Sequence, residues 1–273
     1  MPELPEVETV KRTLNTLVKG KVIESVDIIY PGIIKGDITA FKETTKGATI
    51  YNIERRGKFL LFDLGDYYLL SHLRMEGKYF LKPLDAAKNK HEHIIFRLEH
   101  GETLRYHDVR KFGTMEIKNK QAVFHEPPLS LLGREPIDPS FDSMALYRTL
   151  KAKKKAIKTA LLDQHIISGL GNIYVDETLF CAHIHPEKLT YKITKKEAQT
   201  LSVCAKNVLE KAVALGGSSI RSYTNSLGIT GRFQTKLRVH LKKGEPCPQC
   251  ETEIKKIKVN GRGTYFCKHC QKR

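Results

Sequence analysis

The sequence has no apolar run close to the ~20 residues that a membrane-spanning helix needs, and its start lacks the charged-then-apolar pattern of a signal peptide. We therefore expect a cytoplasmic protein. It also has no internal repeat, no low-complexity tract and no heptad pattern, so a monomer is the expectation. A length of 273 residues and an apolar content of 40% are typical of one large globular domain or two of ordinary size.

Acidic residues are scarce in the C-terminal half. Residues 1–130 hold 21 Lys and Arg against 18 Asp and Glu, whereas residues 131–273 hold 26 against 12, and the whole chain carries +17. Such asymmetry indicates a polyanion bound mainly by the C-terminal half, and nucleic acid is the first candidate. An acidic membrane surface is the second candidate, which the absence of a basic amphipathic anchor or a lipidation motif weakens.

The hydrophobic pattern changes along the chain. Helical spacing over residues 3–19, ended by Gly20, predicts a short N-terminal helix. Short apolar runs broken by turn residues then predict antiparallel strands in a sandwich or barrel. These strands are expected at 21–30, 49–64, 67–81, 93–99, 103–109 and 114–118. Proline and glycine at 127–136 mark a boundary. Helices are expected beyond it, at 144–150, 156–162, 173–180 and 195–214.

Two Cys-x-x-Cys pairs stand near the C-terminus with 16 residues between them. They consist of Cys247, Cys250, Cys267 and Cys270. The spacing, with Asn260-Gly261 as a turn, predicts a β-hairpin closed by one structural zinc ion on four thiolates. His269 lies within the second pair and is a possible competing ligand. A disulfide reading of these pairs fits poorly in a chain without a secretory signal. Cys181 and Cys204 lie in predicted helices and are expected to be ordinary buried or part-buried thiols.

The chain begins Met1-Pro2, followed by Glu3 and Glu6. A small second residue allows the methionine to be removed, which leaves the Pro2 nitrogen as a secondary amine. Such an amine can attack an electrophilic carbon and form an iminium, with the two acids near enough to move protons. The alternative is that Met-Pro is a common start and that the acids only favour a helix N-terminus.

Seven segments together resemble the bacterial formamidopyrimidine-DNA glycosylases over essentially the whole chain. They are residues 2–8, 56–59, 71–77, 108–113, 169–174, 216–221 and 261–264. The resemblance implies an α+β multidomain fold. An N-terminal helix on a two-sheet antiparallel β-sandwich would occupy residues 1–130, and a helix-two-turns-helix DNA-binding domain would occupy residues 131–225. The C-terminal part, 226–273, would hold the four-cysteine zinc-finger hairpin at about 239–273.

The family's catalytic roles transfer to five positions. Pro2 would attack C1′ of the damaged nucleoside, Glu3 would protonate the opening sugar oxygen, and Glu6 would position and deprotonate the amine. Lys58 would serve β-elimination and phosphate contact, and Arg262 the later elimination. The plainer readings are a solvated lysine for Lys58 and simple phosphate binding for Arg262.

The resemblance also implies a wedge that fills the space left by an extruded nucleotide, made of Met75, Arg110 and Phe112. Met is adaptable, Phe stacks on bases and Arg can bond the orphaned partner base. The other reading places Met75 and Phe112 in the core.

Four further positions match phosphate-contacting residues of the family, namely Arg74, His91, Lys154 and Asn172. The lysines of the stretch 151–158 are otherwise expected to add to the positive field individually rather than to make named contacts. Tyr223, in the polar loop 219–231, matches the segment that closes over an everted oxidised purine.

The leading hypothesis is a base-excision repair enzyme that removes oxidised purines from damaged double-stranded DNA and then cleaves the abasic strand. It would work in the bacterial cytoplasm at the nucleoid, with zinc but no nucleotide cofactor and no membrane partner. One alternative is an endonuclease VIII-like glycosylase for oxidised pyrimidines. Another is a non-catalytic zinc-ribbon DNA-binding protein, which the basic charge and the four cysteines predict equally well.

Overall fold

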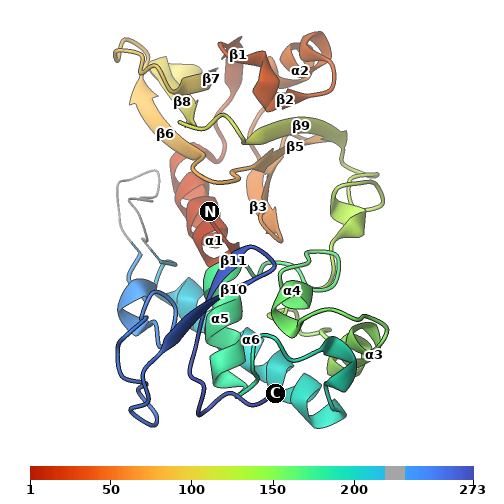
Figure 1. The fold of residues 1–273 in the computed structure, drawn as a ribbon. Coiled ribbons are helices and arrows are strands. Elements are labelled where there is room, and N and C mark those ends of the chain that lie inside the picture. The colour runs from red at the N-terminus through yellow and green to blue at the C-terminus, as the bar shows by residue number, and fades with distance from the viewer. Residues whose placement is uncertain (219–230) are drawn as a thin grey trace. The chain divides into compact units, whose positions relative to one another are not determined.

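The computed structural model describes residues 1–218 and 231–273 (Figure 1). The chain forms two compact units, described separately below. The first holds Met1–Leu131 together with the segment Gly216–Gly231, and the second holds Leu132–Leu215 with Arg232–Arg273. Among the described residues, no helix combines the length and the apolar character that crossing a bilayer requires.

The first unit begins with helix α1 (Leu4–Val18), as the sequence predicts. Pro5 fits the first turn because its missing N–H would have no partner there. One face of α1 is fully buried, including Val7 and Leu14. On another face, the Asn15 amide exchanges two hydrogen bonds with the backbone of Ile53, at 2.7 and 2.9 Å. These bonds join α1 to the edge strand of a sheet, and so fix the helix on the β-structure.

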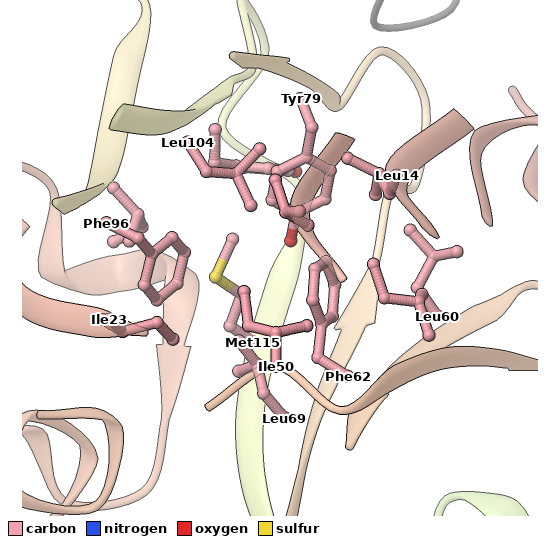
Figure 2. Close-up of a cluster of buried hydrophobic side chains, with 14 of the residues drawn as sticks. Leu14, Ile23, Ile50, Leu60, Phe62, Leu69, Tyr79, Phe96, Leu104 and Met115 are labelled. Atoms are coloured by element: carbon pink, nitrogen blue, oxygen red, sulfur yellow. The ribbon is translucent and has the colours of Figure 1, made fainter. Parts of the chain in front are cut away.

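Two sheets make up the rest of the first unit. The five-stranded sheet has the order β2 (Ile34–Lys35), β9 (Thr114–Asn119), β5 (Tyr67–His72), β4 (Phe59–Asp63) and β3 (Asn52–Arg56). The four-stranded sheet has the order β1 (Ile23–Ile28), β7 (Glu92–Leu98), β8 (Glu102–His107) and β6 (Lys78–Pro83). Side chains of both sheets meet in one buried cluster, including Phe62, Tyr79, Phe96 and Met115 (Figure 2). The predicted sandwich is therefore confirmed.

Four details of the first unit differ from the sequence prediction. The expected strand 49–64 is two strands, β3 and β4, because the chain turns at Gly57 with φ +57°. The expected strand 67–81 is also two, and its halves β5 and β6 belong to different sheets. The short helix α2 (Ile38–Thr45) was not predicted, although Asp37 caps it by accepting the Ala40 N–H at 2.7 Å. The two-residue pairing of β2 with β9 is parallel, whereas all the other strand pairs of the described chain are antiparallel.

The second unit holds four α-helices and a two-stranded hairpin (Figure 1). They are α3 (Ser143–Lys151), α4 (Ile157–Leu161), α5 (Asn172–Cys181), α6 (Lys195–Ala214), β10 (Lys255–Val259) and β11 (Arg262–Phe266). The chain also has 3-10 turns at Pro31–Ile33, Glu99–Gly101, Leu129–Leu131, Thr190–Lys192 and Phe233–Lys236. Helix α6 starts with a capping box, since Glu197 N–H donates to Thr194 Oγ1 and the Thr194 N–H donates to Glu197 Oε2. The four predicted helices are all present.

Helix α5 is buried on nearly every side, from Tyr174 to Phe180. Its carboxylates are buried too. Glu177 accepts backbone N–H groups of Arg238, Val239 and His240 at 2.9–3.1 Å, which holds the segment leading to the hairpin.

The expectation that Cys181 and Cys204 are two separate thiols was wrong, because they form a disulfide between α5 and α6. Their Cα atoms lie 5.8 Å apart, within bridging distance.

Candidate active site

The two acids that follow Pro2 are held by the first turn of α1 and by a remote glycine-serine segment. Glu3 and Glu6 are only 2% and 4% exposed. Glu6 Oε2 accepts the Glu3 N–H at 2.8 Å, and Glu6 Oε1 accepts the Ser218 N–H at 2.7 Å. A Cβ on Gly217 would lie 2.6 Å from Glu6 Oε1, so this approach requires glycine. Two carboxyl groups are thus fixed beside the buried Pro2.

Lys58 lies in the tight turn between β3 and β4 and is 5% exposed. The turn is tied to α1 through Arg55, which donates to Gly57 O at 2.9 Å and to Glu8 Oε2 at 3.0 Å. Burial raises the pKa of Glu8, but hydrogen bonds from Lys11 and Arg55 outweigh it and lower the pKa to about 2. The ion pair therefore keeps Lys58 at the N-terminal end of α1.

Glu3, Glu6 and Lys58 all influence the pKa of the amine at the chain terminus. Burial lowers the pKa of the Met1 α-amino group, Glu3 and Glu6 act to raise it, and Lys58 acts to lower it. The net direction is down, which favours the neutral amine. With Met1 in place the Pro2 nitrogen is a tertiary amide. Once Met1 is removed, the same charges act on the Pro2 amine one residue away. The first unit thus brings together Pro2, Glu3, Glu6 and Lys58, four of the five predicted catalytic residues.

His72, at the end of β5, is a buried histidine on which the charges of Arg74 and Lys58 act, and sequence reasoning did not single it out although it lies within the segment 71–77. Its Nδ1 accepts the Arg74 N–H at 3.0 Å, so the imidazole is neutral. Burial lowers the pKa of His72 to about 3, with further lowering by Arg74 and Lys58. The charge of Lys58 therefore lowers the pKa of His72 as well as that of the terminal amine.

We predict that His72 makes the protein less stable in mild acid. Its folded pKa lies below its unfolded value of about 6.5, so the unfolded chain takes up the proton and stability falls as the pH drops through that value. Between pH 7.5 and 5.5, urea unfolding should show a loss of about 1.4 kcal/mol from this residue. Glu8 does not interfere, because its contribution is lost only when the pH falls from its unfolded pKa towards 2.

A His72→Gln variant should lack this component of the pH dependence, while the exposed His125→Gln variant should keep it. Equal pH dependence in the wild type and in His72→Gln would contradict the neutral, buried imidazole.

Two of the predicted wedge residues lie on a loop organised by Asp108, a fully buried carboxylate that sequence reasoning did not single out. Asp108 accepts the N–H groups of Arg110, Phe112 and Gly113 at 3.0, 3.0 and 2.8 Å. The Arg110 guanidinium lies 4.6 Å from the centre of the Phe112 ring. Phe112 is 52% exposed, which excludes its placement in the core. An Asp two residues before Arg110 is typical of an Asx turn, in which the Asp side chain binds the backbone two residues on. This spacing was the sequence signal that could have indicated the role of Asp108.

The other predicted DNA-contacting residues of the first unit lie on neighbouring turns. Arg74 is exposed, with φ +52°, and Met75 is half-buried in the same turn between β5 and β6. His91 accepts the Asp108 N–H through its carbonyl at 3.0 Å, and its ring lies 5.4 Å from that of His107. Their roles in DNA binding stay predictions, as does that of Tyr223, which lies outside the described residues.

In the second unit, Lys154 and Arg262 are exposed, and Arg262 directly follows the hairpin turn. The Asn172 amide donates to Gly263 O at 3.0 Å.

The expectation that every lysine of the stretch 151–158 is solvated was wrong for Lys158. This side chain is fully buried and pairs with Asp176 at 2.7 Å. A buried lysine does not act as a general contributor to the surface field. Its burial between helices depends on contacts distant in sequence, which the local pattern does not reveal.

The four finger cysteines converge. Their sulfur atoms all lie within 4.8 Å of one another, with separations of 3.9 Å for Cys247–Cys270, 3.5 Å for Cys250–Cys267 and 3.3 Å for Cys250–Cys270. A tetrahedral zinc site with Zn–S bonds of about 2.3 Å has sulfur separations of about 3.8 Å. The exposed His269 is not part of this group. The cysteines therefore fit one structural zinc ion that closes the β10–β11 hairpin.

Comparisons with known proteins cover the whole chain. Three family models match: the formamidopyrimidine-DNA glycosylase N-terminal domain at residues 1–115, the H2TH domain of the same glycosylase at 132–224, and the zinc finger found in FPG and IleRS at 244–273. Formamidopyrimidine-DNA glycosylases of Exiguobacterium sibiricum and Bacillus subtilis are each 52% identical over 99% of both chains.

The fold matches solved structures equally well. Lactococcus lactis Fpg in complex with DNA containing an abasic site has a TM-score of 0.94 and 45% identity, with complete coverage of both chains. A mutant of the Lactococcus lactis protein bound to DNA containing Fapy-dG has a TM-score of 0.95 at the same identity and coverage. The chain belongs to the formamidopyrimidine-DNA glycosylase family.

Proposed function

We propose that the protein removes oxidised purines, namely 8-oxoguanine and formamidopyrimidines, from duplex DNA and then cleaves the abasic strand. The observation that carries this proposal is the cluster at the start of α1, where Glu3, Glu6 and Lys58 are buried and all three act on the charge of the terminal amine. The Lactococcus lactis relatives bound to abasic-site and Fapy-dG DNA support the same substrate class.

In the first step the Pro2 amine attacks C1′ of the damaged nucleoside and the C1′–base bond breaks. Glu6 orients the chain end through its bond to the Glu3 N–H and takes the proton that the amine loses, and the base departs with a proton. Glu3 protonates the sugar ring oxygen, so the ring opens and an iminium joins C1′ to the Pro2 nitrogen. General acid–base assistance of this kind contributes typically ~10²–10⁴ in rate, and a lowered amine pKa supplies more of the neutral nucleophile.

In the second step the iminium acidifies the C2′ hydrogens. Loss of a C2′ proton expels the 3′ phosphate, which is the β-elimination assigned to Lys58. A further elimination expels the 5′ phosphate, and we assign it to Arg262. Hydrolysis of the remaining imine frees Pro2.

The target nucleotide must leave the base stack, which costs a few kcal/mol. Arg110 and Phe112 project from the Asp108-organised loop, with Met75 on a turn of the same unit, and we assign these three to the vacated space. Arg74, His91, Lys154 and Asn172 are assigned to phosphate contacts, which fix the register without reading sequence. The basic C-terminal half supplies the electrostatic attraction.

The substrate class is tested by single-turnover base release from matched duplexes carrying 8-oxoguanine opposite cytosine, thymine glycol opposite adenine, or no lesion. We expect the fastest release from 8-oxoguanine and none from the undamaged duplex. Faster release of thymine glycol would support the endonuclease VIII-like alternative. Binding of all three without release would support the non-catalytic alternative.

A further inference from the structure

A buried polar network lies behind the finger turn in the second unit. Asp176 on α5 accepts from Lys158 Nζ at 2.7 Å through Oδ1, and its Oδ2 lies 2.8 Å from His240 Nδ1. The same Oδ2 accepts the Tyr265 N–H of β11 at 3.3 Å. The side chains of Lys158 and Asp176 are 0% exposed and that of His240 is 7% exposed. One carboxylate thus joins α4, β11 and the segment before the hairpin.

Two donors of this region meet at the carbonyl of Gly263. Lys158 Nζ donates to it at 3.0 Å, and so does Asn172 Nδ2 at 3.0 Å. Asn172 and Asp176 stand four residues apart, so they share one face of α5. The network therefore holds a main-chain atom of the finger and not only side chains.

Gly263 immediately follows Arg262, whose backbone is fixed on both sides. Asn260 and Gly261 have φ of +47° and +73°, which is typical of a two-residue type I′ hairpin turn. Arg262 then pairs with Val259 across the hairpin, and its carbonyl accepts the Thr264 hydroxyl at 2.9 Å. The side chain of Arg262 is exposed while its main chain is held.

Stability alone does not account for such a network. Replacing a buried ion pair by apolar residues of similar volume is often neutral or stabilising, because desolvating the charges offsets their attraction. The charges instead fix the direction of a hydrogen bond, because Asp176 orients the Lys158 ammonium towards the carbonyl oxygen of Gly263. Apolar packing does not fix a hydrogen-bonding direction.

We propose that Lys158, Asp176 and His240 are positioning residues for Arg262: through the Gly263 carbonyl they hold the finger turn so that the guanidinium reaches the sugar-phosphate intermediate in the second elimination. This inference rests on the proposed function and on the role assigned there to Arg262. It predicts that the network governs the later elimination more than base release or β-elimination.

The test uses full-length, zinc-loaded protein and a duplex with a preformed abasic site. The ratio of the δ-elimination product, with a 3′ phosphate, to the β-elimination product, with a 3′ unsaturated aldehyde, is followed over time. Arg262→Gln measures the contribution of the guanidinium. Lys158→Met removes one bond to Gly263 O together with the pair to Asp176. His240→Phe removes a bond to Asp176 while keeping a ring against Tyr265. Lys188→Met, which removes a part-buried pair with Glu197, is the matched control.

We expect Lys158→Met and Arg262→Gln each to lower the product ratio about tenfold, since a misplacement of about 1 Å can cost that much or more. His240→Phe should lower it less, and Lys188→Met should leave it unchanged. The double variant Lys158→Met/Arg262→Gln should be no worse than Arg262→Gln alone, because both changes remove the same contribution. The rate of β-elimination should stay at the wild-type value in Lys158→Met, His240→Phe and Lys188→Met, and every variant should keep one zinc ion per chain.

A wild-type product ratio in Lys158→Met and His240→Phe, with a lowered ratio in Arg262→Gln, would overturn the positioning role and leave the proposed function intact. A wild-type ratio in Arg262→Gln would overturn the role assigned to Arg262 and this inference with it. Loss of zinc in both network variants would assign the network to folding alone and would also overturn the proposal.

Discussion

Replacing Pro2 with glycine should lower the single-turnover rate of 8-oxoguanine release by a factor of about 100 or more. Glycine leaves a primary amine at the chain end, but it removes the ring that fixes the backbone there. The amine is then no longer held against Glu3 and Lys58, and misplacement of a reacting atom by about 1 Å can cost ~10²-fold. Rapid-quench measurement of base release gives the rate.

The matched control is Pro5→Ala, which changes a buried proline in the first turn of α1 without touching the terminal amine. It should keep a rate near that of the wild type. Both variants should bind an abasic duplex with unchanged affinity, because the basic surface is intact. A wild-type rate in Pro2→Gly would contradict the assignment of the nucleophile.

Removal of zinc should abolish tight binding to abasic duplex DNA. Four thiolates hold the hairpin, and zinc binding to small fingers supplies about 10–16 kcal/mol of folding free energy. Without the metal, the exposed Arg262 and the backbone around Gly263 lose their support. We expect Cys250→Ser protein to lose the ion and at least ~100-fold in affinity by fluorescence anisotropy, as expected when several phosphate contacts are lost together.

Cys204→Ser provides the control, because Cys204 lies in the disulfide to Cys181 and outside the four-sulfur group. It should retain zinc and affinity. The β-sandwich of the first unit has its own core, so its thermal unfolding should not change in Cys250→Ser. Zinc-free protein with unchanged affinity for DNA would show that the finger does not take part in binding.

Much of the fold could be predicted from sequence because its periodicities are local. The apolar spacing of Val7, Val10 and Leu14 predicted α1, and the cysteine spacing predicted the finger ligands. The boundaries of 49–64 and 67–81 were wrong because each range holds two apolar stretches separated by a charged one. The chain turns within that charged stretch, at Gly57 in the first range and near Met75 in the second.

The residues predicted to be catalytic at the N-terminus could be found from motifs, whereas three buried polar residues that organise other parts of the molecule could not. Asp108 and His72 are buried and accept backbone N–H groups two to five residues away. Lys158 instead contacts a carbonyl 105 residues away. A lysine within the run 153–158 is expected to be solvated on composition alone. Only packing shows that Lys158 is fully buried and paired with the buried Asp176 inside the helical unit.

Reductive trapping tests the central claim most directly. The protein is incubated with an 8-oxoguanine duplex and borohydride, and the adduct is located by mass spectrometry of the proteolysed complex. The account predicts one stable cross-link, on the nitrogen of Pro2 in chains that have lost Met1, and none on chains that retain it. Strand cleavage at full rate by Met1-bearing chains, or a cross-link on Lys58 in place of Pro2, would contradict it.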